Sequence, residues 1–403
     1  MKYIKILLVI LLIVNCVGAN AQSRRIPKTN VTATVVGQLS DTLNNTSSLF
    51  YWQDRLWTLN DHGDIVFYAI DAETGAIEGI IDTHLPIEDM EEVAQDEDYF
   101  YFGDFGNNHP QLRSELYIYR MSKSDLFRGN YVVDTTTFLF SGYDPEAPND
   151  HEALPITDFD CEAMVAAGDS LYLFSKQWTT QQTICYALPK QPGEYTAAAC
   201  HQFNIGGLVT GAWLHPETCL LVLCGYSLLC QPFVWLFYDY QGHNFFGGEN
   251  RQLVLGNGVG SQMEAIVSRD GLHYYLTQER FNQLGISNQA ALLELDLSEY
   301  LRDYLYPDTT SVEGLGALER PMLKAFPNPT RGLLNLEIPK ATNDLQDARV
   351  VLYATDGREL LQRPVTSERM QLSLSGMPAE QYLVRVVSQR GSTQPLRVVK
   401  MCP

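Results

Sequence analysis

Short runs of aromatic and β-branched residues alternate along most of the chain with turns rich in Gly, Asp, Asn and Pro. Apolar residues at helical spacing are scarce. Apolar runs of four to eight residues bounded by such turns are typical of β-strands. The pattern of hydrophobic and polar positions therefore predicts an all-β protein.

One pattern recurs five times: an apolar strand, a tight polar turn and a second, aromatic strand. We expect the first strands at residues 49–52, 92–94, 162–165, 209–213 and 264–267. The second strands are expected at residues 56–61, 99–104, 171–176, 220–223 and 273–277. Two more strand candidates follow each of the first four copies, but only residues 291–297 follow the fifth.

The strand that the fifth copy lacks can come from residues 31–39, which precede the first copy. Four-stranded units that repeat at this spacing are typical of a β-propeller. Closing the last unit with the first strand of the chain removes exposed sheet edges. We therefore expect a five-bladed β-propeller over residues 22–305. A six-bladed one is the alternative, because the stretch between the second and third copies could hold a degenerate blade.

The N-terminal 21 residues have the layout of a secretory signal peptide. Lys2 and Lys5 give a positive start, residues 6–17 are almost wholly apolar, and Ala19 and Ala21 form a small-residue cleavage site. The apolar run is short for a membrane span, and no later stretch is long and apolar enough. We therefore expect an exported protein that is not an integral membrane protein.

Charge divides the rest of the chain. Residues 1–317 hold 16 Lys and Arg against 40 Asp and Glu, whereas residues 318–403 hold 12 against 8. The acidic body repels phosphate backbones, which argues against nucleic-acid binding. It suits an extracellular protein or one that collects cations. Residues 306–320 are expected to be the linker between the two parts.

Seven cysteines follow the predicted signal peptide, so at least one of them lacks an intramolecular partner. They are Cys161, Cys185, Cys200, Cys219, Cys224, Cys230 and Cys402. Export permits disulfides, and the candidate cross-strand pairs are Cys185 with Cys200 and Cys219 with Cys230. Buried free thiols are the alternative.

Polar residues fall at equivalent places in the repeat. In a propeller, the loops that enter the innermost strands and those that leave the next strands lie on one face, around one mouth of the central channel. The residues expected there are Glu92, Glu162, Glu264, Asp104, Asn60, Asp61, Lys176, Glu279 and Arg280, with Ser48 and Thr210 as counterparts of the glutamates. His151, Glu152 and Asp160 could cap this mouth from the loop before the third copy.

Three ionised glutamates around one axis repel one another, and this repulsion raises the pKa of at least one of them. Lys176 and Arg280, a proton or a metal ion must compensate, and Ca²⁺ is the natural metal for oxygen ligands. Two of the carboxylates could instead serve as the acid and the base or nucleophile of a hydrolase. A structural role, in which the side chains cap strand ends, is the third possibility.

Several of these segments resemble a propeller family common in secreted Bacteroidetes proteins, most of them of unassigned function. The resemblance covers most of residues 45–300 and is carried by residues 91–96, 101–108, 160–163, 174–178 and 262–266. A looser likeness is to phytase-like esterase and gluconolactonase-like propellers, whose central carboxylates bind a divalent metal. It implies either a binding protein for a small molecule, a glycan or Ca²⁺, or a hydrolase of a sugar, lactone or phosphoester. The family's Trp-Glu-Asp reads Met90-Glu91-Glu92 here, which leaves the second channel carboxylate uncertain by one residue.

Residues 321–403 read as short alternating strands, typical of a small Ig-like β-sandwich. Motif residues lie in its turns and last strands: Pro327, Asn328, Pro329, Gly332, Asp356, Gly357, Tyr382 and Lys400. In order and spacing these motifs resemble the type A C-terminal sorting domain of the type IX secretion system. The resemblance implies export across the outer membrane of a Gram-negative cell, with the translocon and the sortase as partners. The protein would then be extracellular or anchored to lipopolysaccharide at the cell surface.

Overall fold

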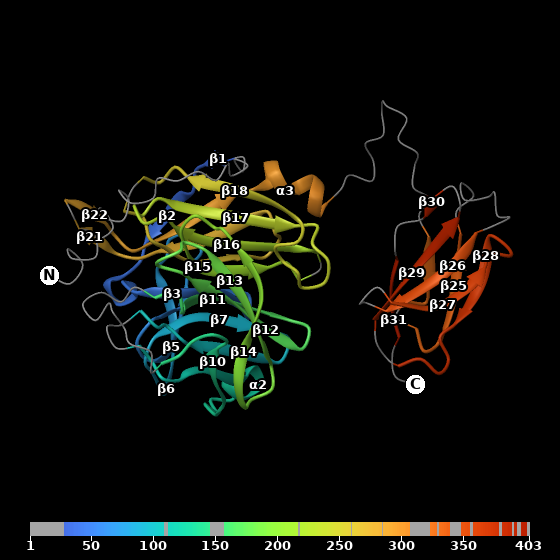
Figure 1. The fold of residues 1–403 in the computed structure, drawn as a ribbon, viewed down its shortest axis with the longest axis horizontal. Helices are drawn as coiled ribbons and strands as arrows, with labels where there is room; N and C mark the ends of the chain where they lie inside the picture. Colours follow the sequence, from blue (N-terminus) through green and yellow to red (C-terminus); the bar gives the residue numbers. More distant parts are fainter. Residues whose placement is uncertain are drawn as a thin grey trace. The chain divides into compact units, whose positions relative to one another are not determined.

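A computed structural model of the chain describes residues 28–108, 112–145, 157–216, 218–258, 260–283, 285–306, 323–328, 330–338, 348–354, 358–378, 381–388, 391–392 and 396–400. The chain divides into two compact units, Met1–Pro307 and Asp308–Pro403 (Figure 1). The expected signal peptide, His151, Glu152 and most of the expected linker lie outside the described residues.

The first unit is all-β, as predicted. Each of the first four copies of the repeat contributes four consecutive antiparallel strands, which we describe as one sheet per copy even where an outer strand pairs further. The first sheet holds β3 (Thr46–Trp52), β4 (Arg55–Asn60), β5 (Gly63–Ile70) and β6 (Ile77–Ile87). The second holds β7 (Met90–Gln95), β8 (Tyr99–Asp104), β9 (Leu116–Ser122) and β10 (Val133–Phe140). The third holds β11 (Asp160–Ala167), β12 (Ser170–Lys176), β13 (Thr183–Pro189) and β14 (Glu194–Phe203). The fourth holds β15 (Leu208–Leu214), β16 (Leu220–Tyr226), β17 (Pro232–Tyr238) and β18 (Glu249–Leu255).

The fifth sheet takes one strand from the start of the described chain. It runs β19 (Met263–Ser268), β20 (His273–Gln278), β23 (Ala291–Asp296) and β2 (Thr34–Gln38). β2 pairs antiparallel with β23, so that Thr34 faces Glu294 and Gln38 faces Ala291. This confirms the expectation that residues 31–39 complete the last copy of the repeat.

Two parallel pairings join outer strands. β1 (Lys28–Val31) lies along β18, and β10 lies along β14, which links the second and third sheets into eight strands. Residues 112–145 add only α2 (Lys123–Phe127) to β9 and β10, so the part described there contains no sheet between the second and third copies. The remaining elements are the 3₁₀ turn η1 (Asp41–Leu43), the hairpin β21 (Phe281–Gln283) and β22 (Ile286–Asn288), and α3 (Ser298–Leu305).

The first strands of the five sheets form a closed ring, in the order β3, β7, β11, β15, β19 and back to β3. A separate hydrophobic cluster fills the space between each pair of neighbouring sheets. Side chains alternate across a strand, so Leu49 packs toward the fifth sheet and Phe50 toward the second. Both faces of these sheets are therefore buried, which explains why the second strands read as continuous apolar runs.

The second unit contains two sheets that share one hydrophobic core. One sheet has β24 (Lys324–Phe326), β25 (Leu333–Glu337) and β28 (Arg369–Ser373). The other has β26 (Arg349–Ala354), β27 (Glu359–Pro364), β29 (Gln381–Ser388), β30 (Gly391–Ser392) and β31 (Leu396–Val399). In the described parts of the chain, no helix is long and apolar enough to cross a membrane.

The two candidate disulfides are not formed, because all six described cysteines are free thiols. Cys219 precedes the start of β16, whereas Cys230 precedes β17 where Pro232 pairs with the end of β16. The two thiols therefore lie at opposite ends of one antiparallel hairpin. Cys185 pairs in register with His201 and not with Cys200, which lies at a shift in register and is exposed. Cys402 lies outside the described residues.

Candidate functional site

Each first strand carries a β-bulge at the same point of the ring. The registers skip one residue between Thr46 and Ser48, Met90 and Glu92, Cys161 and Ala163, Val209 and Gly211, and Met263 and Ala265. The five skipped residues are Ser47, Glu91, Glu162, Thr210 and Glu264, and a bulge redirects the side chain of the residue it inserts. We call these the bulge residues. Glu162, Glu264 and Thr210 were expected at equivalent places.

The second sheet departs from the expectation by one residue. Its bulge residue is Glu91 and not Glu92, and the matching residue of the first sheet is Ser47 and not Ser48. Glu91 lies beside Asp89 over Gly106, where a Cβ atom would come within 2.3 Å of Glu91 Oε1 and 2.2 Å of Asp89 Oδ2. Only a glycine leaves room for both carboxyl groups at this point.

Lys176, at the end of β12, lies among the bulge residues. It forms an ion pair with Glu162, and both side chains are about 95% buried. Its Nζ lies 5.1 Å from the ring centroid of Trp178 and 5.4 Å from that of Tyr226. Burial alone would lower the pKa of Lys176, but Glu162, Tyr226 and Glu264 together raise it well above the usual range. Lys176 is therefore a fixed positive charge.

The two carboxyl oxygens of Glu162 differ in their hydrogen bonds. Its Oε1 accepts from Lys176 and, at 3.4 Å, from Asn108 Nδ2. Its Oε2 is buried and has no hydrogen-bond partner among the residues that the structure describes. Burial raises the pKa of Glu162 to about 8. The charge of Lys176 lowers this pKa and the charge of Asp160 raises it, and both effects are smaller than that of burial. Glu162 thus presents a desolvated acceptor that the described protein does not use.

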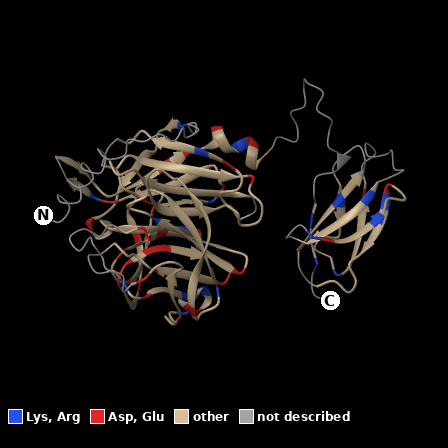
Figure 2. Ribbon diagram, viewed as in Figure 1, with Lys and Arg blue, Asp and Glu red and all other residues tan. Residues whose placement is uncertain are grey.

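Glu264 and Glu279 complete the group from the fifth sheet. Burial first, and then the charge of Glu279, raise the pKa of Glu264 well above its usual range. Burial and the charge of Asp61 raise the pKa of Glu279 to about 8. For Glu91, burial and the charge of Glu162 raise the pKa in the same way. We call Glu91, Glu162, Lys176, Glu264, Glu279 and Asp61 the acidic mouth; Figure 2 shows how Asp and Glu are spread over the first unit.

Three residues expected at the mouth have other partners. Asp104 accepts from Arg113 at 3.0 Å and from the backbone N–H of Asp89 at 2.9 Å, which makes it part of a buried structural network. Arg280 points to Asp41, 3.6 Å away at the surface, so it does not neutralise the mouth. Asn60 donates to the Thr42 carbonyl at 2.8 Å.

Sequence reasoning missed Asp89 and Arg113, and it left Glu91 open as the alternative to Glu92. A signal for Asp89 and Glu91 was present, because Asp89-x-Glu91 repeats as Asp160-x-Glu162. Asp160 was expected only as a cap, and it does hold the loops: it accepts the N–H groups of Asn107 and Cys161 and the indole N–H of Trp178. Arg113 lies in a loop that carries no repeat signal.

Three possible metal-ligating side chains come together at one place outside the acidic mouth. In the described residues, the one group of three His, Cys, Asp or Glu side chains whose ligand atoms lie within 4.8 Å of one another is Asp64, Asp82 and His84. All three are exposed on β5 and β6, away from the first strands. Among the described residues, the carboxylates of the acidic mouth do not form a group of this kind.

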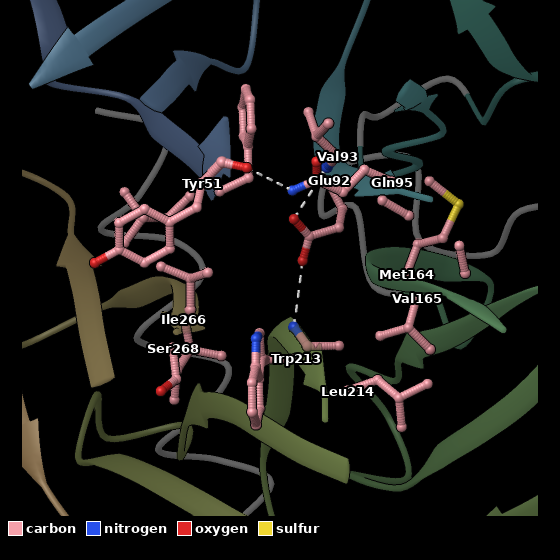
Figure 3. A pocket seen from close by; sticks show the side chains of 16 residues that line it. Tyr51, Glu92, Val93, Gln95, Met164, Val165, Trp213, Leu214, Ile266 and Ser268 are labelled. Carbon is pink, nitrogen blue, oxygen red and sulfur yellow. Dashed lines mark hydrogen bonds between the residues drawn. The ribbon is translucent and has the colours of Figure 1, made fainter. Parts of the chain in front are cut away.

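Glu92 points into the channel enclosed by the ring (Figure 3). Its Oε1 accepts from Ser48 Oγ at 2.7 Å and from the N–H of Val93 at 3.0 Å. Its Oε2 accepts from the N–H of Ala212 at 3.2 Å. The side chain thus joins β3, β7 and β15 across the channel. Burial raises the pKa of Glu92 to about 8, and these hydrogen bonds lower it in smaller measure.

In the second unit, motifs that are distant in the sequence meet at one place. Asn328 Oδ1 accepts from the N–H of Val399 at 2.8 Å, and its Nδ2 donates to the Arg397 carbonyl at 2.7 Å. Lys400 donates to the Met377 carbonyl, and Gly332 adopts a φ of +137° beside it. Pro327 follows Phe326 through a cis peptide bond, and Tyr382 is buried and donates to the Pro378 carbonyl at 2.8 Å. Pro329, Asp356 and Gly357 lie outside the described residues.

This unit matches a known family. Residues 324–400 match the model of the secretion system C-terminal sorting domain. Residues 324–400 are a type IX secretion C-terminal sorting domain. The sorting domain indicates export through the type IX system to the cell surface or the extracellular space, and it implies contact with that secretion machinery.

No curated protein matches the chain by sequence. Among solved structures, the extracellular domain of a one-component system protein from B. thetaiotaomicron is 9% identical, with a TM-score of 0.31. The match covers 93% of this chain and 60% of that one, so the chain spans less than two thirds of its length. A glucose dehydrogenase-type oxidoreductase from Thermus thermophilus is 11% identical, with a TM-score of 0.35 and coverage of 66% and 100%. The computationally designed Ika8 protein is 9% identical, with a TM-score of 0.26 and coverage of 91% and 100%. At these scores the matches assign neither an activity nor a ligand.

Proposed function

We propose that the first unit is a five-bladed β-propeller that binds a small cationic ligand at the acidic mouth, outside the cell. The sorting domain, which we take to be an Ig-like β-sandwich, delivers it there and is then exchanged by the sortase for a lipopolysaccharide anchor. Five four-stranded sheets, five hydrophobic clusters between them and the ring of first strands support the propeller.

The observation that carries the binding proposal is Glu162 Oε2, a buried oxygen without a partner in the described residues. It faces a group in which Lys176 is opposed by Glu91, Glu162, Glu264 and Glu279. Burying an ionised carboxylate is costly unless a positive charge pairs with it. A cationic ligand supplies that charge, whereas an anionic one would meet the carboxylates.

The ligand we favour is an organic amine and not a bare Ca²⁺ ion. The mouth carboxylates are not gathered within 4.8 Å of one another, as the metal-like group on β5 and β6 is. Trp178, which lies against Lys176 and is half-buried, offers ring surface to a second cation. Aromatic faces attract ammonium groups by about 0.5–2 kcal/mol.

The test is calorimetric titration of the purified protein with putrescine and, separately, with Ca²⁺, at pH 6.5 and pH 8.5. Putrescine should bind more tightly at pH 8.5, because carboxyl groups with pKa values near 8 ionise over that interval. Glu162→Gln should weaken binding at least tenfold, and Glu78→Gln, an exposed carboxylate outside the mouth, should not. Binding of Ca²⁺ alone would replace the amine by a metal, and binding of neither would refute the proposal.

A hydrolase is the second candidate function. Burial raises the pKa of Glu279 to about 8, so this carboxyl group can hold a proton at neutral pH, as a general acid must. Asp61, which acts on Glu279 electrostatically and is partly exposed, is the candidate second carboxyl group. Turnover of a glycoside, lactone or phosphoester by the wild type that Glu279→Gln abolishes would establish this function. A panel of such substrates without turnover would exclude it.

A further inference from the structure

The channel has a second end. A cavity of about 170 Å³ lies among residues 49–51, 92–95, 164–166, 212–214 and 266–268, so all five first strands line it (Figure 3). No residue of the acidic mouth belongs to this lining, although Glu92 directly follows the bulge residue Glu91 in β7. The cavity is therefore distinct from the site proposed above.

Most of the lining residues are apolar, among them Val165, Leu214 and Trp213, but the wall offers polar and apolar surface in about equal parts, because strand backbone also lines it. The polar side chains of the lining are Glu92, Gln95 and Ser268. Two of these three are already used by the protein. Gln95 donates to the Tyr51 carbonyl at 3.0 Å and accepts from Lys123 at 2.7 Å, and Ser268 donates to the His273 carbonyl at 2.6 Å.

Glu92 keeps an unused acceptor position. Its Oε1 accepts two hydrogen bonds, whereas its Oε2 accepts one, from Ala212. In an ionised carboxyl group each oxygen has two lone pairs, so above the pKa of Glu92, about 8, Oε2 can accept one more hydrogen bond from inside the cavity. The carboxyl group lies in the cavity wall, where Figure 3 shows it between Val93 and Trp213.

Glu92 also stands apart from the acidic mouth electrostatically. Its pKa is set by burial and by its three hydrogen bonds, with no contribution from Glu162 or Glu264. Those two glutamates, in contrast, act on each other. A ligand at one end of the channel therefore need not disturb the charge balance at the other.

We propose that this cavity is a second binding site, which takes a small neutral molecule with an apolar ring or branched chain and one hydrogen-bond donor directed at Glu92 Oε2. The size fits this class, since an engineered apolar cavity of about 150 Å³ in another protein binds benzene. An oligosaccharide is too large for it. A bare cation would find a single carboxyl group there, that of Glu92.

The experiment uses phenol as the probe and anisole as its methylated counterpart, which fills the same space without a donor. Ligand-observed NMR titration of the full protein above the pKa of Glu92, at about pH 9, should give a dissociation constant for phenol of about 1 mM or tighter. Anisole should bind about 3- to 10-fold more weakly, which is the usual effect of one hydrogen bond.

Two variants fill the cavity at different depths. Val165→Phe changes a buried residue, and Leu214→Phe changes a half-buried one at the rim, so that at least one should fold. Each should abolish phenol binding while putrescine binding at the acidic mouth is unchanged. Glu162→Gln is the matched control and should bind phenol like the wild type. Equal affinity for phenol and anisole, unaltered binding to both filled variants, or no phenol binding by the wild type would overturn the proposal.

Discussion

At the scale of single residues, Glu92 shows how one side chain closes the inside of the ring. The free edges of the first strands turn backbone N–H groups toward the channel, and buried N–H groups need acceptors. Glu92 accepts from two of them, Val93 and Ala212, on strands of different sheets. Burial also disfavours the ionised form of this carboxyl group, which raises its pKa to about 8.

Glu92 should therefore make the stability of the protein depend on pH. Its pKa is about 8 when folded and near 4.5 when unfolded, so the folded state holds the proton between these values and stability falls as pH rises through them. The loss from pH 5 to pH 9 is on the order of 4 kcal/mol from this group. Thermal melting at each pH should show a flatter dependence for Glu92→Gln. A variant at an exposed glutamate, Glu78→Gln, should keep the slope of the wild type.

Residue identity at the mouth was predictable only as far as the bulges repeat. Glu162, Glu264 and Lys176 follow from their places in the repeat, because strand ends and tight turns recur in the sequence. Whether Glu91 or Glu92 lies at the mouth depends on which residue the bulge inserts. The sequence could not decide this, because both placements leave the apolar residues of β7 in the same pattern. The ion pair of Arg280 with Asp41 was not predictable, since Asp41 comes from a distant segment.

At the scale of elements, β2 decides whether the fifth sheet has an exposed edge. Without it, β23 would present unpaired N–H and C=O groups to solvent, a template for aggregation. β1, by contrast, adds a fifth strand to a sheet that already has four. The two neighbouring segments therefore differ in what their removal exposes.

Deletion of residues up to 38 should destabilise the protein far more than deletion up to 31. The first removes β1 and β2 and opens the ring between the first and fifth sheets, while the second removes β1 alone. We expect aggregation or a loss of the cooperative melting transition for the longer deletion. The shorter one should remain soluble with a lower melting temperature. Similar melting of both proteins would contradict the structural role of β2.

Most strands were predicted within two or three residues, because both periodic apolar runs and turn residues mark them. The pairing of β2 with β23 was also predictable, since the fifth copy lacked a strand and one stood unassigned. The parallel contacts of β10 with β14 and of β1 with β18 were not. Outer strands meet through tertiary packing, which leaves no local mark in the sequence.

At the scale of the whole molecule, the sorting domain determines where the first unit works. Asn328 ties the turn at its start to the strand at its end through two hydrogen bonds, to Val399 and Arg397. The motif residues are therefore a single structural feature of the folded domain. Their scattered positions in the sequence reflect the order of its strands.

Asn328→Ala should impair export. It removes both hydrogen bonds, worth about 1–3 kcal/mol together, and releases the last strand from the turn. We expect the variant to accumulate inside the cell envelope and to decline in the medium and at the surface, as measured by immunoblotting of cell fractions. Gln362→Ala, at an exposed residue of β27 in the same domain, is the matched control. Normal export of the Asn328 variant would show that the machinery does not read this junction.

The five bulges have a consequence for how such a molecule can change over evolution. Each one takes a single side chain out of the alternation that fills the spaces between sheets, so its identity is not constrained by core packing. Five equivalent positions around one opening can therefore carry different side chains, here those of Ser47, Glu91, Glu162, Thr210 and Glu264. Recognition could be rewritten there by single substitutions while the scaffold stays intact, which makes the ring a natural starting point for engineered binders.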